Sequence, residues 1–477
     1  MKSRLVRYTF LMSLMSLAAC GGGGGGEVGA VPATNSSDLS YTSPTTTTAP
    51  TQPVDATPVA PTKWGAPVLL QSSADWSSPW AADVAFDLNG NALAVWQYSG
   101  NIWASRYDAA TKNWSTAVTI SDVADIGNIP KIAFDSKGNA MAVWEWQSRS
   151  SSEQHIGANY YSVATGSWGT PTVIDVADGG ASYDVDLAFD GNGNAMVVWD
   201  KPSGVYEPVS VWYNRYDAAA GVWGTPGLID NDNVNTASRP EIAVAPNGDA
   251  LAIWEQRDGA RNNVMFARYA AATTSWGTPA LLEFQDLGDA WSPDIAMDPN
   301  GNAIAVWEQD NGTTRDAVAR RYIAASGTWD AAPVILENLE DDVSYVRIVL
   351  DANGNALALW MQAITLNGTP SIFSTRYDAA TGSWSTAAVI ENSNYTSIYP
   401  ELSIGANGNA MAIWEERTTG NQVANYYDAT TQTWGVAAPV ETSSDPANYG
   451  AVAVAPDGSA VAIWTQSNAL WASHYQQ

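Results

Sequence analysis

The chain has 477 residues, with 49 Asp or Glu against 21 Lys or Arg, and its formal net charge at pH 7 is −28. A surface this acidic repels nucleic acid, so we expect no nucleic-acid partner. The chain contains one Cys and two His residues, His155 and His474, and it has no His-Glu-x-x-His, Gly-x-Ser-x-Gly or P-loop motif. These observations exclude disulfide bonds, transition-metal sites and His-based catalytic triads.

The first residues have the pattern of an export signal. A positive segment with Lys2, Arg4 and Arg7 precedes an apolar run from Thr9 to Leu17. The run is too short to span a membrane, and its flanks are typical of a secretory signal peptide. We therefore expect residues 1–20 to act as a signal peptide.

The run ends in Leu17-Ala18-Ala19-Cys20, which resembles the lipobox of bacterial lipoproteins. The resemblance implies cleavage before Cys20 and attachment of lipid to its sulfur and amino group. Several acyl chains on one residue would anchor the protein stably to a membrane. Gly21, in place of an acidic residue, implies by the same resemblance the outer membrane of a Gram-negative bacterium. The alternative is an ordinary signal peptide in which Cys20 is incidental.

Residues 21–62 have the composition of a tether. Six glycines are followed by Thr, Pro, Ser and Ala, with almost no large apolar side chains. Such a segment cannot bury enough surface to offset the entropy lost on ordering, so we predict that it is disordered. A flexible chain of this length would span on the order of 35 Å root-mean-square.

One sequence pattern occurs eight times at intervals of roughly 50 residues, which indicates a repeat architecture. It first appears at residues 86–96 as Phe-Asp-Leu-Asn-Gly-Asn-Ala-Leu-Ala-Val-Trp. Its final residue, Trp96, recurs as Trp144, Trp199, Trp254, Trp307, Trp360, Trp414 and Trp464. Asn-Gly between two apolar runs, as in Asn89-Gly90, predicts a β-hairpin with a two-residue type I′ turn, in which both central residues have positive φ.

Each unit is predicted to form four strands. In the first unit these are strand A from Asp83 to Asp87, strand B from Asn91 to Gln97, strand C from Ile102 to Tyr107, and strand D from about Trp114 to Ile120. Strand B is apolar on both faces, which is typical of a strand buried between sheets. Four-stranded sheets arranged radially make a β-propeller. We therefore predict an all-β fold, an eight-bladed β-propeller with four antiparallel strands per blade over residues 63–477, and we expect it to be monomeric.

The two ends of this region complement each other. The last unit stops at Tyr475, just after strand C, and lacks strand D. The missing sequence stands at the front as Trp64-Gly65-Ala66-Pro67-Val68-Leu69-Leu70. We expect this N-terminal strand to complete the eighth blade and cover an otherwise exposed sheet edge.

The units resemble the β-propeller repeats of exported bacterial proteins over about residues 63–477. They lack the Gly-His and Trp-Asp landmarks of WD40 repeats, and they do not keep the Ser-x-Asp-x-Gly-x-x-Trp spacing of the sialidase Asp-box. Sialidase chemistry is therefore not carried over to this chain. Because propellers host many functions, the fold alone assigns none.

Two sets of carboxylates are expected at one face of the propeller, which we call the top face, where A strands start and B strands end. The long B–C and D–A loops lie on the same face, and variable loops on a rigid scaffold are the expected place for recognition. Aromatic residues such as Trp80 and Trp291 come just before strand A. Ring faces beside carboxylates suit a sugar, and they also suit a basic or aromatic peptide.

The predicted ligand-binding residues are Trp80, Asp83, Glu145, Tyr183, Asp186, Asp200, Glu241, Glu255, Trp291, Asp294, Glu308, Tyr399, Glu401 and Glu415. The alternative is that the repeat itself requires these residues, with carboxylates bonded to neighbouring backbone and aromatic rings packing the loops.

Calcium is the one cofactor that the sequence leaves open. The Asp-x-Asn-Gly-Asn pattern starts like a calcium loop, but the EF-hand requires Gly at its sixth position and Glu at its twelfth, and neither spacing holds. The pattern is therefore interpreted as a hairpin turn, and the top-face carboxylates are the better calcium candidates. We expect no other cofactor.

Taken together, the sequence favours a lipid-anchored binding or interaction module of the cell envelope, with a carbohydrate or a peptide as ligand. One alternative is a glycoside hydrolase or lyase that uses paired top-face carboxylates as acid and base. Another is a scaffold within an envelope assembly complex.

Overall fold

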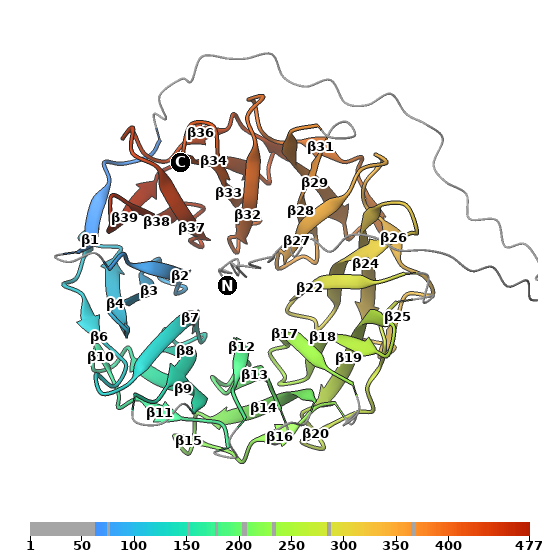
Figure 1. The fold of residues 1–477 in the computed structure, drawn as a ribbon, viewed down its shortest axis with the longest axis horizontal. Helices are drawn as coiled ribbons and strands as arrows, with labels where there is room; N and C mark the ends of the chain where they lie inside the picture. Colours follow the sequence, from blue (N-terminus) through green and yellow to red (C-terminus); the bar gives the residue numbers. More distant parts are fainter. Residues whose placement is uncertain are drawn as a thin grey trace, which may run out of the picture.

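Eight antiparallel sheets are arranged as blades around a central axis (Figure 1). The computed structural model describes residues 63–73, 77–149, 153–176, 180–202, 208–230, 235–283, 288–363 and 368–477. None of these residues is helical, and no helix capable of crossing a bilayer occurs among them. The prediction of an all-β, eight-bladed propeller is confirmed, whereas Cys20 and residues 21–62 lie outside the described residues.

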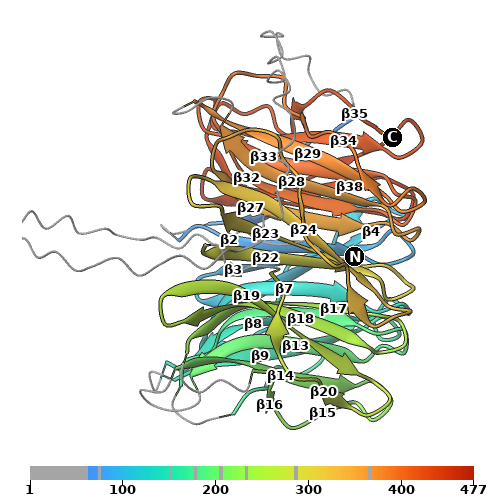
Figure 2. The same cartoon turned by 90° about the vertical axis from the view of Figure 1, so that its right-hand side faces the viewer.

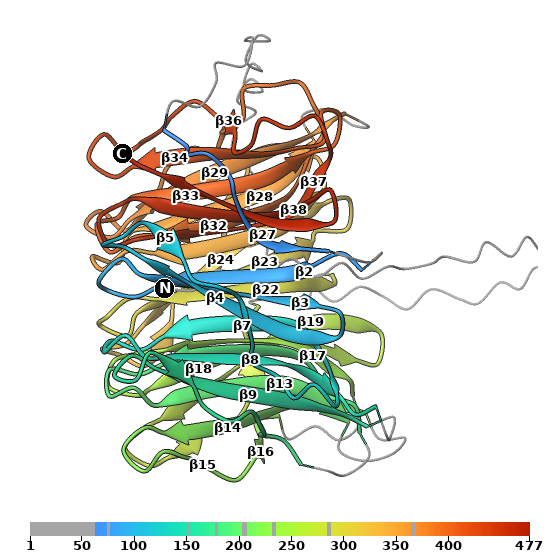
Figure 3. The same ribbon diagram turned by 90° about the vertical axis from the view of Figure 1, so that its left-hand side faces the viewer.

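Each blade runs outward from strand A at the axis to strand D at the rim (Figure 1). Two side views show the strands running across the thickness of the disc (Figure 2 and Figure 3). The A strands are β2 (Trp80–Phe86), β7 (Ile126–Phe134), β12 (Tyr183–Phe189), β17 (Ala237–Val244), β22 (Ala290–Met297), β27 (Val343–Leu350), β32 (Ser397–Ile404) and β37 (Ala447–Val454). The B strands are β3 (Ala92–Tyr98), β8 (Ala140–Gln147), β13 (Ala195–Pro202), β18 (Ala250–Asp258), β23 (Ala303–Asp310), β28 (Ala356–Ala363), β33 (Ala410–Glu416) and β38 (Ala460–Gln466). The C strands are β4 (Asn101–Asp108), β9 (Gln154–Ser162), β14 (Val209–Asp217), β19 (Arg261–Ala270), β24 (Arg315–Ile323), β29 (Pro370–Asp378), β34 (Asn421–Asp428) and β39 (Ala469–Tyr475).

Strand D is interrupted in the first seven blades, where it consists of two short segments paired with strand C. The first segments are β5 (Asn113–Trp114), β10 (Ser167–Trp168), β15 (Val222–Trp223), β20 (Ser275–Trp276), β25 (Thr328–Trp329), β30 (Ser383–Trp384) and β35 (Thr433–Trp434). The second segments are β6 (Val118–Thr119), β11 (Thr172–Val173), β16 (Gly227–Leu228), β21 (Ala280–Leu281), β26 (Val334–Ile335), β31 (Ala388–Val389) and β36 (Ala438–Pro439). In the Trp-Gly-Thr-Pro version of this motif, the Pro has no N–H to donate to the ladder, which fits a break at this point.

A β-bulge lengthens strand A in every blade. β2 begins at Trp80, three residues before the predicted start at Asp83. Between them, Ala81 and Ala82 form a bulge opposite the repeated Trp96, and the other seven A strands are bulged at the same place. The second bulge residue is a proline in four blades, namely Pro130, Pro240, Pro293 and Pro400. Proline is tolerated within a strand at such a bulge, because the ladder is already interrupted there.

The A–B hairpins are present, but their turns are not the predicted type I′. In the first blade the Asp87 N–H donates to the Asn91 carbonyl at 2.8 Å, so that three residues lie in the loop. Gly90 has φ +80°, and Asn89 is not among the described residues with positive φ. One Asp87 carboxylate oxygen accepts the backbone N–H groups of Asn89 and Asn91, at 2.8 Å each. These bonds stabilise a type I turn followed by a left-handed Gly, which is a common three-residue hairpin.

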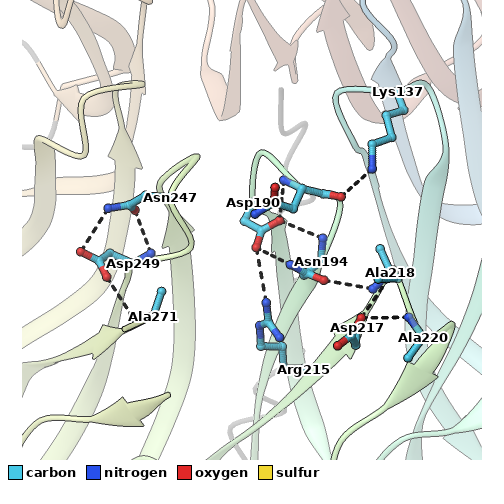
Figure 4. A network of polar contacts seen from close by, with 12 residues as sticks. Lys137, Asp190, Asn194, Arg215, Asp217, Ala218, Ala220, Asn247, Asp249 and Ala271 are labelled. Carbon is cyan, nitrogen blue, oxygen red and sulfur yellow. Dashed lines mark hydrogen bonds and ion pairs between the residues drawn. The ribbon is translucent and has the colours of Figure 1, made fainter. Parts of the chain in front are cut away.

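Figure 4 shows how the same turn is tied to the neighbouring C–D turn. In the third blade, Asp190 accepts two backbone N–H groups of its own turn, at 2.9 Å each. The Asn194 side-chain oxygen then accepts the N–H of Ala218 in the C–D turn, at 3.0 Å. In the fourth blade, Asp249 takes the place of that Asn and accepts the N–H of Ala271 at 2.9 Å. The Asp of the Asp-x-Asn-Gly-Asn pattern thus holds a hairpin turn.

The hydrophobic core lies between adjacent blades. Each of its clusters joins residues of two neighbours; for example, Trp199 of the third blade is clustered with Val143 and Ile156 of the second. All eight repeated Trp side chains are fully buried. Truncation of such a side chain to Ala typically costs 3–5 kcal/mol of folding free energy, so the Trp residues are main contributors to blade packing.

A Gln two residues after the Trp supplies a hydrogen-bond acceptor in half of the blades. The indole N–H groups of Trp254, Trp307, Trp360 and Trp464 donate to Gln256, Gln309, Gln362 and Gln466, at 2.8, 3.0, 3.0 and 3.4 Å. In the other blades this position holds Tyr98, Trp146, Lys201 and Glu416. Within the described residues, the buried indole N–H groups of Trp96, Trp144, Trp199 and Trp414 have no hydrogen-bond partner.

The N-terminal strand closes the ring as predicted. β1 (Val68–Ser72) pairs antiparallel with β39 and forms the outer strand of the eighth blade. Before β1, the chain is already attached at Trp64, which forms a bridge to Tyr475 with the two rings 5.2 Å apart. The eighth and first blades share a hydrophobic cluster, as other neighbouring blades do.

Candidate functional site

Three of the predicted mouth residues, Asp83, Asp186 and Asp294, lie in joints between blades. Their side chains are buried, because the bulge moves them three residues into strand A. Their Oδ2 atoms accept the backbone N–H groups of Ile132, Ile242 and Ile348 of the next blade, at 3.0, 3.0 and 3.1 Å. They were expected as the first residues of strand A, around the top mouth, and this position is therefore corrected.

Glu241 and Glu401 occupy the same position in the fourth and seventh blades. Glu241 is half-buried and Glu401 is buried. A carboxylate oxygen of Glu401 lies 3.8 Å from Nη2 of Arg347, which holds this position in the sixth blade. A cation and an acid of adjacent blades therefore face each other here.

Carboxylates at the ends of the B strands hold the bulge of the next blade. Oxygens of Glu145, Asp200, Glu255 and Glu308 accept the backbone N–H groups of Asp184, Arg239, Ser292 and Tyr345, at 3.3, 3.2, 2.7 and 2.9 Å. Each of these N–H groups belongs to a bulge, where the ladder leaves a donor unpaired. The last predicted carboxylate of this set, Glu415, is half-buried, and burial raises its pKa against the opposing effect of Arg417.

The first residue of each bulge has a left-handed backbone. These residues are Ala81, Ile129, Asp184, Arg239, Ser292, Tyr345, Tyr399 and Tyr449, with φ between 44° and 58°. For an L-residue this conformation costs roughly 1–2 kcal/mol. Ala81 and Ser292 show that the bulge can form with a small side chain at this position. Blades four, six, seven and eight nevertheless have a large one, Arg or Tyr.

The predicted aromatic residues fall at two different positions of strand A. Trp80, Tyr183 and Trp291 are paired strand residues immediately before the bulge, which corrects their expected position in loops. Trp80 and Trp291 are half-buried, and Tyr183 is 41% exposed. Tyr399, in contrast, is itself a bulge residue.

Arginines contact the top-face carboxylates of the fourth and fifth blades. Nη1 of Arg239 lies 3.0 Å from Oε1 of Glu255, and Nη1 of Arg315 lies 3.1 Å from Oε2 of Glu308. The Arg315 guanidinium also lies over the Trp291 ring, 6.0 Å from its centroid. Burial raises the pKa of Glu308, with a contribution from Glu255, while Arg315 and the hydrogen-bonded backbone oppose the increase.

The tyrosines of the last three blades lie together. The rings of Tyr345 and Tyr399 are 5.2 Å apart in an edge-to-face arrangement. Burial raises the pKa of Tyr345, with a contribution from Tyr399, while Arg347 and Arg239 oppose the increase. Burial likewise raises the pKa of Tyr449, with contributions from Glu415 and Tyr399.

We call the resulting group the rim cluster, and its members are Arg239, Trp291, Arg315, Tyr345, Arg347, Tyr399 and Tyr449. Only Trp291 and Tyr399 were among the predicted site residues. For Arg239 the available sequence signal was the following Pro240, since a proline inside a strand-like run indicates a bulge.

Below the rim cluster, the central channel contains a cavity of about 390 Å³. Apolar side chains of successive A strands line it, including Phe134, Phe189, Val244, Met297, Leu350 and Ile404. It extends from Arg347 to Pro246 and Pro299 in the A–B turns. Its volume is within the range of small-molecule sites.

A second set of buried acids, which sequence reasoning missed, follows the D strands. Its members are Asp230, Glu283, Glu337, Glu391 and Glu441, together with Asp175, whose side chain is buried. Glu337 accepts a bond from Gln362 of the next blade at 3.2 Å, whereas Glu391 has an acid, Glu416, as its counterpart. Burial raises the pKa of Glu391 to about 7, and Glu416 adds to this shift.

A buried ionic group lies between the second and third blades. Nζ of Lys201 is 3.2 Å from Oδ2 of Asp175, and both side chains are fully buried. Nδ1 of His155 lies 3.1 Å from Oδ1 of Asp175, and the Ser182 hydroxyl donates to Oδ2 at 2.6 Å. Serine and histidine thus both contact the carboxylate, which differs from the serine–histidine contact of a nucleophilic triad.

No group of three or more His, Cys, Asp or Glu side chains that could hold a metal ion occurs in the part of the chain that the structure describes. Several of the top-face carboxylates predicted as calcium candidates are engaged by backbone N–H groups or arginines, as described above.

Comparison with known proteins shows likeness of fold only. No protein-family model and no curated protein matches the chain. Solved structures similar to it include the Dos1 propeller, at 9% identity over 84% of this chain and 95% of that one, with a TM-score of 0.47. Others are the NanB sialidase from Streptococcus pneumoniae (8% identity, 85% and 94% covered, TM-score 0.39) and an ulvan lyase of polysaccharide lyase family PL25 (10%, 70% and 89%, 0.44). Propeller sialidases and a lyase are thus among the structural neighbours, but at these values the likeness carries no argument about activity.

Proposed function

We propose that this protein is a carbohydrate-binding module of the cell envelope, and that its ligand binds at the top mouth over blades four to eight. The rim cluster carries this proposal. It combines half-buried ring faces, which can stack on a sugar ring, with hydroxyl and guanidinium donors for sugar oxygens. The channel cavity below it gives room for a saccharide end.

Binding to a glycan array, followed by titration of the best ligand, tests the proposal. Tyr345→Ser, Tyr399→Ser and Tyr449→Ser introduce the residue that the fifth blade has at the same position, Ser292. Each should weaken binding about tenfold, since stacking on an aromatic ring is worth on the order of 1–3 kcal/mol for bases and we take a similar value for sugars. Ile129→Ser, at the same bulge position of the second blade, is the matched control. Unchanged affinity in all three Tyr variants would contradict the proposal.

A glycoside hydrolase or lyase is the second candidate, and one observation favours it. Glu255 and Glu308 are buried acids of adjacent blades, and the backbone of Ser292 bonds to Glu255 while its hydroxyl faces Glu308. Because burial raises the pKa of Glu308, it is the better candidate for a general acid. Release of reducing ends or unsaturated products from a bound glycan, abolished by Glu308→Gln, would favour the enzyme over the module.

Display at the envelope is proposed from Cys20. Cys20→Ser should leave the protein soluble or unprocessed, because lipid on this residue is the proposed anchor. Fractionation of cells expressing each form measures this, and stable membrane association of the variant would contradict lipid anchoring at Cys20.

A further inference from the structure

We infer that the saccharide bound at the rim cluster is an anionic one that carries carboxylates, as in a polymer of uronic acids. This inference rests on the proposed function and specifies its ligand. The sequence predicted an acidic top face, whereas this inference requires that the surface facing the ligand be cationic.

The acids near the mouth are already engaged in the fold. Asp83, Asp186 and Asp294 accept backbone N–H groups across blade joints. Glu255 and Glu308 are buried against bulge N–H groups and arginines. Because these carboxylates are buried or already hydrogen-bonded, they contribute little negative charge to the surface that a ligand would contact.

The cations of the same region are the more exposed partners. The Arg239 side chain is 45% exposed while that of Glu255 is 9% exposed. The Arg315 side chain is 37% exposed and that of Glu308 is 5% exposed. A guanidinium has five N–H donors in a planar fork, so one carboxylate contact leaves donors for a second carboxylate. The solvent-facing edge of the Arg239–Glu255 pair is therefore cationic, within a protein whose net charge is −28. Arg315 has a second partner, since its Nη2 lies 3.6 Å from Oδ2 of Asp342, whose side chain is 59% exposed.

The cations and the rings are on the same side of the mouth. Arg239, Tyr345, Tyr399 and Tyr449 occupy equivalent left-handed bulge positions of blades four, six, seven and eight. Blades one, two and three have Ala81, Ile129 and Asp184 at these positions. Guanidinium groups in blades four to six, followed by rings in blades six to eight, match a saccharide whose units have a carboxylate and an apolar ring face.

The test uses pairs of ligands that differ only in charge. Fragments of polygalacturonate, alginate and glucuronan are compared with their carboxyl-reduced, neutral counterparts by isothermal titration calorimetry on the full propeller. We expect at least one acidic fragment to bind tenfold or more tightly than its neutral counterpart. Arg239→Gln combined with Arg347→Gln should reduce that preference to about twofold, because it lowers the affinity for the acidic fragment far more than the affinity for the neutral one.

Arg268→Gln is the matched control, because Arg268 is 44% exposed and lies 3.0 Å from Asp249 on the opposite face. This variant should keep the full preference for the acidic fragment. Equal affinity of acidic and neutral fragments, or a preference that survives in the double variant, would overturn the inference and leave carbohydrate binding standing. If no fragment of either kind binds and the wider glycan array is also silent, the proposed function fails as well.

Discussion

Two positions that recur in every blade adopt a left-handed backbone for different reasons. At the A–B turn the residue is Gly in all eight blades, as with Gly90, and the conformation carries no steric penalty. At the bulge it is never Gly, although an L-residue is strained there. The N–H of the bulge residue is held by a carboxylate of the preceding blade in several joints, as Glu308 holds that of Tyr345. The strain is thus retained by a contact between blades.

Replacement of the most strained bulge residue should stabilise the fold. Ile129 has φ 44°, and a β-branched side chain is especially unfavourable in this region. Ile129→Gly should raise the free energy of unfolding by about 1 kcal/mol, the strain relieved exceeding the small amount of packing lost at a half-buried site. Urea denaturation measures the change. Ala81→Gly, at the same position of the first blade, should give a smaller gain, and destabilisation by Ile129→Gly would show that its side-chain packing outweighs the strain.

Sequence reasoning could place the hairpins but not these conformations. Asn89-Gly90 predicted a turn correctly, yet the turn type depends on Asp87, whose carboxylate bonds to backbone N–H groups. The identity of the residues at the top mouth depends even more on the register of strand A, which the bulge changes. Without the bulge, Asp83 heads strand A at the mouth; with it, the position belongs to residues such as Tyr345 and Arg239.

Between blades, buried polar pairs accompany the apolar core. Most D-strand acids face a neutral or cationic residue of the next blade, as Glu337 faces Gln362 and Asp175 faces Lys201. The joint between the sixth and seventh blades instead places Glu391 beside Glu416, and both are buried. Two carboxylates in one buried site favour a shared proton. This joint should therefore depend on pH.

The pKa of Glu391 is about 7 in the folded protein against an ordinary value of 4.5. The folded state then binds a proton that the unfolded chain releases, so this contribution to stability is fully present below about pH 4.5 and is lost as pH rises through 7. The free energy of unfolding should fall by on the order of 2–3 kcal/mol from pH 5 to pH 8 through this group. Glu391→Gln should remove that part of the dependence, as measured by urea denaturation at both pH values.

Glu416→Gln is the companion variant, because it removes the second carboxylate and keeps Glu391. It should flatten the pH dependence partly. If Glu391→Gln has the same pH dependence as the wild type, the proton is not held at this joint.

For the whole molecule, the number of blades and their closure could be read from the sequence because each unit repeats the same strong signals. The buried Trp recurs eight times, and the D strand missing at the C-terminus is present near Trp64. Such a ring has one seam, where strands from the two ends of the described chain pair. Its stability should therefore depend on a few residues at the seam.

Deletion of residues 63–72 should destabilise the propeller far more than deletion of residues 21–62. The first deletion removes β1, uncovers the edge of β39 and takes away the Trp64–Tyr475 contact. We expect the melting temperature to fall by on the order of 5–10 °C, which corresponds to a loss of a few kcal/mol in a protein of this size. Thermal unfolding followed by circular dichroism measures it, with the deletion of 21–62 as control. Equal melting temperatures for the two deletions would mean that β1 contributes little to closure.

The seam also determines how the molecule would respond to mechanical force. Any pull on the chain before Lys63 reaches the propeller first at Lys63, whose carbonyl accepts the Gln476 N–H at 3.0 Å. Next come the bonds of Gly65, whose N–H donates to the His474 carbonyl at 2.8 Å and whose carbonyl accepts the Ser473 hydroxyl at 2.8 Å. A pull along β1 loads its bonds to β39 together, in shear, whereas a pull outward from the rim breaks the bonds of the seam one after another from Lys63 onward. The strand that closes the ring is thus also the element on which the force acts, and a protein held by its N-terminus would resist drag along the strand far better than peeling away from it.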